Sequence, residues 1–151
     1  MNPDVRMVAH ADPDAFRLGF PPMDEVHAEF VLAVEALLKA PDGEVARAFA
    51  DLERLTREHF EIEERWMTET EFPARECHAD EHAAVLRSVV GVGERVARGE
   101  FEPTRTLAAA LLDWFPAHAD YMDAALAHWM CKLRFGGKPV VLRRGASATA
   151  D

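Results

Sequence analysis

Several features that mark other protein classes are scarce or missing in this chain of 151 residues. Its two cysteines, Cys77 and Cys131, form no CxxC pair, which excludes a disulfide framework and a thiolate zinc site. Basic residues number 17 against 27 acidic ones, and the formal charge of -10 argues against binding to nucleic acid or to an anionic membrane. The chain shows neither an apolar run of membrane-spanning length nor a signal peptide. A single reduced, cytoplasmic domain over residues 1–151 is therefore predicted.

Helical periodicity dominates the apolar pattern, and no strand-like alternation competes with it. Short connections between helical segments make neighbouring helices antiparallel. The pattern predicts an all-α fold, an up-down-up-down four-helix bundle with a helical core over about residues 24–133. A non-helical N-terminal arm of about 15 residues precedes it, and a short C-terminal tail follows Gly137. The expected helices cover about residues 24–39, 44–68, 74–97 and 103–133.

Polar residues recur where these helices should face one another. Five of the seven histidines lie on predicted inward faces, and a carboxylate accompanies them on two helices. Any one pair at i,i+4 spacing is more simply a solvated helix face, but all four helices carry such residues. Burying them without partners would cost roughly 1–3 kcal/mol each, against about 5–15 kcal/mol for the stability of a whole domain. A metal site satisfies them together, and its candidate ligands are His27, His59, Glu63, His78, His82, His118 and Asp123.

Five imidazoles and two carboxylates exceed what one ion can coordinate, so two ions with bridging carboxylates are predicted. Structural zinc usually has four ligands, often thiolates. Magnesium and calcium prefer oxygen ligands. Iron, manganese and cobalt all suit imidazole with carboxylate, and iron is favoured for oxygen chemistry. The composition of the site leaves the choice among these three metals open.

The motifs around these residues resemble those of the hemerythrin family, in its single-domain bacterial form. "MDEVH" ends at His27, "HFEIEERWM" contains His59 and Glu63, and "FP" precedes the HxxxH pair of His78 and His82. "WFPAH" ends at His118, and Asp123 completes an HxxxxD motif. The match covers roughly residues 16–130.

This resemblance implies two non-haem irons, bridged by hydroxide or oxide and by Glu63 and Asp123, that bind dioxygen reversibly without acting as an enzyme. One iron would take His78, His82 and His118. The other would take His27 and His59 and keep an open position. Other small ligands such as azide or nitric oxide would fit the same position. The dry dioxygen pocket would be lined by Phe30, Phe60, Trp114 and Phe115.

Storage, delivery or scavenging of dioxygen is the leading function under this resemblance. A di-iron oxidase, a peroxidase or a nitric-oxide-handling enzyme is the main alternative, and steady turnover with a reductant would distinguish it. A redox sensor and a metal store are weaker alternatives. A sensor would usually have a further domain, and a store would not need a closed, fixed ligand set.

Some residues depart from the family pattern or from ideal helix geometry. Family members often have leucine at the position of Phe115 and isoleucine at that of Ala119, and Phe16 is the nearest candidate for the usual tryptophan of the arm. His118 and Asp123 are five residues apart, roughly 140° around an ideal helix. A π-type widened turn is therefore predicted between Pro116 and Asp123.

Three further residues are predicted to lie outside the metal site. His10 and His128 are expected to be structural or solvated. Cys77, although it adjoins His78, is expected to be a free thiol.

Overall fold

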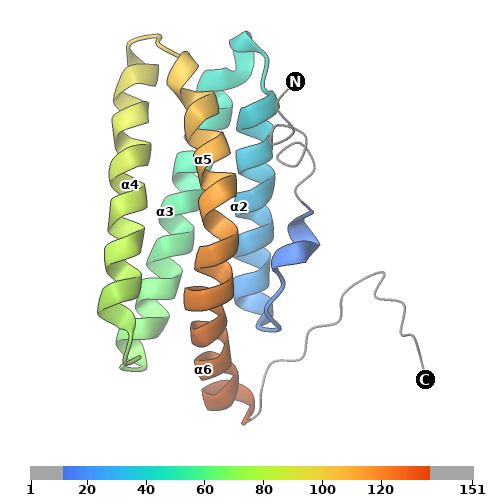
Figure 1. The fold of residues 1–151 in the computed structure, drawn as a ribbon, viewed down its shortest axis with the longest axis vertical. Coiled ribbons are helices and arrows are strands. Elements are labelled where there is room, and N and C mark those ends of the chain that lie inside the picture. Colours follow the sequence, from blue (N-terminus) through green and yellow to red (C-terminus); the bar gives the residue numbers. More distant parts are fainter. Residues whose placement is uncertain (1–11, 137–151) are drawn as a thin grey trace, which may run out of the picture.

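The computed structural model describes residues 12–136, which form an antiparallel four-helix bundle (Figure 1). The rods of the bundle are α2 (Pro21–Lys39), α3 (Val45–Glu69), α4 (Arg75–Ala97) and a long rod made of α5 (Glu102–His118), η3 (Ala119–Asp123) and α6 (Ala124–Phe135). Helix α2 contacts α3 and α5, and α4 contacts the same two helices, so each rod has two antiparallel neighbours. The predicted fold class is thus confirmed.

The ends of the helices follow local chemistry. Pro21 occupies the first position of α2, where its missing N–H and fixed φ are tolerated, so this helix begins three residues earlier than expected. Pro103 lies in the first turn of α5, as predicted. Gly136 ends α6 with a left-handed φ of 68°, a conformation that glycine adopts without steric cost.

The N-terminal arm is not entirely irregular, contrary to the sequence-based expectation. Pro13–Phe16 form a short 3-10 helix, η1, because the carboxylate of Asp12 accepts a hydrogen bond of 3.0 Å from the backbone N–H of Asp14. The carboxylate of Asp24 then accepts hydrogen bonds from the N–H groups of Leu18 and Gly19, at 2.7 and 3.2 Å. These bonds attach the arm to the start of α2. The predicted tail after Gly137 lies outside the described residues.

Two apolar clusters fill the bundle. The upper cluster, named for the end of the bundle that holds the α2–α3 connection in Figure 1, includes Phe30, Leu37, Leu52 and Phe115. The lower cluster, toward the α3–α4 connection, includes Met67. The remaining members of the lower cluster are Phe20, Met23, Trp66, Phe72, Leu126, Ala127, Met130 and Cys131. On α2 and α3, the predicted ligands fall between residues of the upper cluster and residues of the lower one, and Asp123 does so on the last rod. A polar layer is therefore enclosed between two apolar ones.

Candidate metal centre

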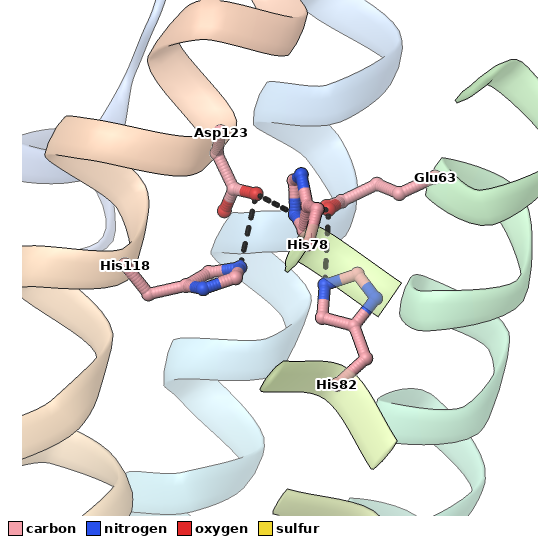
Figure 2. Close-up of side chains that lie close together, drawn as sticks. All are labelled: Glu63, His78, His82, His118 and Asp123. Carbon is pink, nitrogen blue, oxygen red and sulfur yellow. Dashed lines mark ion pairs between the residues drawn. The ribbon is translucent and has the colours of Figure 1, made fainter. Parts of the chain in front are cut away.

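The structure brings all seven candidate ligands together in this polar layer. Each is at most 2% exposed, and every rod contributes at least one of them. Figure 2 shows five of them converging from α3, α4, the end of α5 and η3. Two overlapping sets of ligand atoms lie within 4.8 Å of one another, the first with Glu63, His78, His82, His118 and Asp123, the second with His27, His59, Glu63 and Asp123.

Each carboxylate directs one oxygen toward each set. Glu63 Oε1 lies 3.3 Å from His78 Nε2 and 3.5 Å from His82 Nε2, whereas Oε2 lies 3.2 Å from His27 Nε2 and in contact with His59 Nε2. We call these two groups of histidines the three-histidine half (His78, His82, His118) and the two-histidine half (His27, His59).

Asp123 repeats this division from the opposite side of the layer. Its Oδ1 lies 2.9 Å from His78 Nε2 and 3.1 Å from His118 Nε2. Its Oδ2 lies 3.0 Å from His27 Nε2. One oxygen of each carboxylate therefore faces each of the two halves.

Most of these inward-facing atoms have no hydrogen bond within residues 12–136. The unsatisfied atoms are His59 Nε2, Glu63 Oε1, His78 Nε2, His82 Nε2, His118 Nε2 and both carboxylate oxygens of Asp123. Of the close inward contacts, only that between His27 Nε2 and Glu63 Oε2 has hydrogen-bond geometry. Buried polar groups left in this state cost roughly 1–3 kcal/mol each. Imidazole nitrogens and carboxylate oxygens aimed at common points are a donor set that fits transition-metal ions.

The electrostatics of the layer show how strongly it attracts positive charge. Burial works against protonation of His27, but Asp123 and Glu63 outweigh it and raise the pKa of His27 to about 10. The same balance raises the pKa of His78 to about 9. Burial also opposes ionisation of the two carboxyl groups, yet the surrounding imidazoles hold the pKa of Glu63 and that of Asp123 well below their ordinary values. Without metal, the two carboxylates therefore favour the protonated forms of His27 and His78.

A π-helical turn allows the last rod to present both His118 and Asp123 inward. Residues 119–123 form η3, in which the N–H of Ala124 bonds to the carbonyl of Ala119, five residues earlier. The wider turn brings residues five apart onto one side of the rod. The predicted widened turn is confirmed, and Asp120 in the same turn is exposed.

Two glutamates that the sequence interpretation did not select contact the outer side of the histidines. Glu81 Oε1 lies 2.9 Å from His118 Nδ1 and accepts a hydrogen bond of 2.9 Å from Trp114 Nε1. Glu64 Oε2 lies 3.4 Å from His82 Nδ1. The only sequence signal for either glutamate is its position beside a candidate ligand, as in "EE" at 63–64 and "EH" at 81–82.

The four aromatic residues predicted to line a pocket lie around the layer in different ways. Phe30 and Phe115 are fully buried, and their ring centroids lie 5.5 and 6.2 Å from that of His59. Phe60 is stacked on His82 with centroids 3.9 Å apart and is 5.2 Å from His59. Trp114 instead stacks on His118, 4.4 Å away, beside the three-histidine half.

The arm adds one more ring on the side of the two-histidine half. Phe16 packs on Phe115 with centroids 4.9 Å apart, and Phe115 in turn lies 5.0 Å from His27. Ala119, at the other position that departs from the family pattern, is fully buried.

The residues predicted to lie outside the site remain apart from it where they are described. His128 and Cys77 are exposed, and Cys131 is a buried free thiol. His10 is outside the described residues. Within residues 12–136, no helix combines the length and apolar character needed to cross a membrane.

Comparison with known proteins agrees with this geometry. A buried cluster of histidine, glutamate and aspartate in an antiparallel four-helix bundle defines a class of metal-binding proteins. Residues 19–129 match the hemerythrin HHE cation binding domain. The chain is 32% identical over 119 residues to the bacteriohemerythrin of Ralstonia nicotianae, covering 79% of this chain and 87% of that protein. No solved structure matches the chain significantly. The chain belongs to the hemerythrin family.

Proposed function

We propose that this protein binds dioxygen reversibly at a pair of non-haem irons held by the seven buried residues. The observation that carries the proposal is the split of each carboxylate, with one oxygen of Glu63 and one of Asp123 facing each half of the site. A single ion would not need ligands arranged in two groups. Glu63 and Asp123 would be shared by two ions, one held also by the three-histidine half and the other by the two-histidine half.

The unequal number of ligands supports a binding reaction at one of the irons. The three-histidine half offers five ligand residues and the two-histidine half offers four. A shared oxide or hydroxide bridge would add one ligand to each. With one ligand residue fewer, the two-histidine half would have room for a small molecule, whereas the three-histidine half would not. Azide or nitric oxide would occupy the same place.

When bound, the iron pair supplies the two electrons that dioxygen accepts on binding and returns on release. The chain's own part is to hold the ligands and to exclude water. Phe30, Phe60 and Phe115 are at most 1% exposed and surround the imidazole of His59. A site enclosed by rings gives water little access, and this protects a reactive centre from side reactions. We propose that these three residues line the dioxygen pocket, and that Trp114 borders it through Phe60.

Reversible binding, as opposed to turnover, is the function that we propose, and it accords with the name of the Ralstonia relative. The test is iron analysis of the purified protein, followed by optical spectra under argon, in air and under argon again. We expect about two irons per chain and a charge-transfer band that appears in air and disappears when dioxygen is removed. Continued dioxygen consumption with a reductant would instead show an oxidase. A protein that binds no iron would contradict the proposal.

A further inference from the structure

Glu81 on α4 connects two rings of a neighbouring helix through one oxygen atom. Its Oε1 lies 2.9 Å from Trp114 Nε1 and 2.9 Å from His118 Nδ1, and its side chain is 32% exposed. Trp114 and His118 are four residues apart on α5, so they lie on one face of the helix. Their rings stack with centroids 4.4 Å apart and an angle of 29° between planes. One carboxylate oxygen thus lies within hydrogen-bond distance of a nitrogen on each ring.

The contact decides which nitrogen of His118 carries the proton. Glu81 Oε1 already accepts a hydrogen bond from Trp114 Nε1, a group that can only donate. An ionised carboxylate only accepts hydrogen bonds, so Nδ1 of His118 must be the donor. Nε2 is then left with its lone pair facing the interior of the site, 3.1 Å from Asp123 Oδ1. A carboxylate partner of this kind also makes an imidazole a stronger ligand.

The other histidines have a weaker outer contact or none. His82 Nδ1 lies 3.4 Å from Glu64 Oε2, and the side chain of Glu64 is 40% exposed. Within residues 12–136, the Nδ1 atoms of His27, His59 and His78 have no hydrogen-bond partner. Carboxylate support is thus confined to the three-histidine half, and its shortest contact is the one from Glu81.

We propose that Glu81 is a positioning residue that fixes the His118 ring for metal binding, holds Trp114 over it and makes the three-histidine half the tighter of the two cation positions. This inference rests on the proposed function only in requiring that the seven residues bind metal. It does not require that the metal bind dioxygen.

The test compares Glu81→Ala and Glu81→Gln with Asp80→Asn. Asp80 is the preceding residue on α4, is exposed and has no hydrogen bond or ion pair with the described residues, so its substitution controls for the lost charge. Metal-free protein is titrated with ferrous iron under argon in competition with a chelator. We expect Glu81→Ala to weaken the tighter of the two binding steps by about 10–100-fold, the usual effect of losing an outer carboxylate partner. Glu81→Gln keeps an acceptor oxygen and should show a smaller loss. Asp80→Asn should match the wild type.

A second measurement reads the contact without metal. The indole N–H resonance of Trp114 in the metal-free protein, assigned with Trp114→Phe, should move in both Glu81 variants and stay in place in Asp80→Asn. An unchanged resonance, or iron affinities equal to those of Asp80→Asn, would overturn the inference. If Glu81→Ala does not fold, Glu81→Gln decides the result. Wild-type protein that binds iron but not dioxygen would contradict the proposed function while leaving the role of Glu81 open to the same titration.

Discussion

His118 Nε2 and Asp123 Oδ1 lie 3.1 Å apart although the two residues are five positions apart along one rod. In a regular α-helix they would point about 140° apart. The π turn over Ala119–Asp123 removes this difference, and Pro116 just before it has no N–H to continue the regular bonding pattern. An irregularity in the backbone therefore completes the candidate metal site.

The first prediction concerns the π turn. Inserting one alanine after Tyr121 should place His118 and Asp123 six residues apart, a spacing for which the π turn does not compensate, and should rotate α6 by about 100°, the turn of one residue. Leu126 and Met130 would then leave the lower apolar cluster, so we expect both a large fall in Tm and loss of iron. Tyr121→Ala is the control, because this side chain is 81% exposed and its removal should change stability by less than about 0.5 kcal/mol. Thermal unfolding with iron analysis measures both effects, and an insertion variant that retains full iron would contradict the role assigned to the turn.

The second prediction concerns the bridging role of Asp123. Asp123→Asn removes the charge and replaces one oxygen that faces a cation position, so binding at both halves should weaken. We expect the affinity for iron to fall by more than the roughly 10–100-fold that is lost when an outer hydrogen-bond partner of a ligand is removed. Asp120→Asn, an exposed change in the same π turn, should leave binding unchanged. Iron content after dialysis against a chelator is the measurement. Retention of one tightly held iron, with only the other lost, would show that Asp123 serves a single ion.

The third prediction separates packing from protection of the site. Phe115→Ala should destabilise the protein by about 3–5 kcal/mol, as expected for a fully buried phenylalanine, and should speed irreversible oxidation of the ferrous protein in air. Phe49→Ala removes a ring of the same upper cluster that has no ring contact with the predicted ligands. It should therefore reduce stability without speeding the oxidation of the ferrous protein. Denaturant unfolding and the decay of the optical spectrum distinguish the two. Equal oxidation rates would argue against a protective role for Phe115.

The fourth prediction is a pH dependence of the metal-free protein. The pKa values of His27 and His78 are raised from 6.5 to about 10 and about 9, so their protonation stabilises the folded state fully below about pH 6.5. This contribution is lost as the pH rises through 9 and 10. The Tm of the metal-free protein should therefore fall between about pH 6.5 and about pH 10.

The iron-loaded protein should not show that decline, because metal binding requires the neutral imidazole. His27→Ala should flatten part of the profile of the metal-free protein. A Tm of the metal-free wild type that stays constant from pH 6.5 to 10 would contradict the charge balance described for the polar layer.

Much of this arrangement was predictable because it depends on local spacing. Residues three, four or five apart share a helix face through backbone geometry alone. This suffices to group His59 with Glu63 and His78 with His82, and it anticipates the widened turn between His118 and Asp123. The same reasoning failed in the arm, where the hydrogen bond from Asp14 to the Asp12 side chain makes a 3-10 turn that apolar periodicity does not report.

The amino-acid order specified the four rods, their antiparallel neighbours and the residues that turn inward, since each of these follows from spacing along a single helix. It did not specify that Glu81 reaches across to His118, that Trp114 covers that ring, or that one oxygen of each carboxylate faces each half of the layer. These relations join different rods. They depend on helix rotation, axial offset and side-chain rotamers, which are set together by the packing of the two apolar clusters above and below.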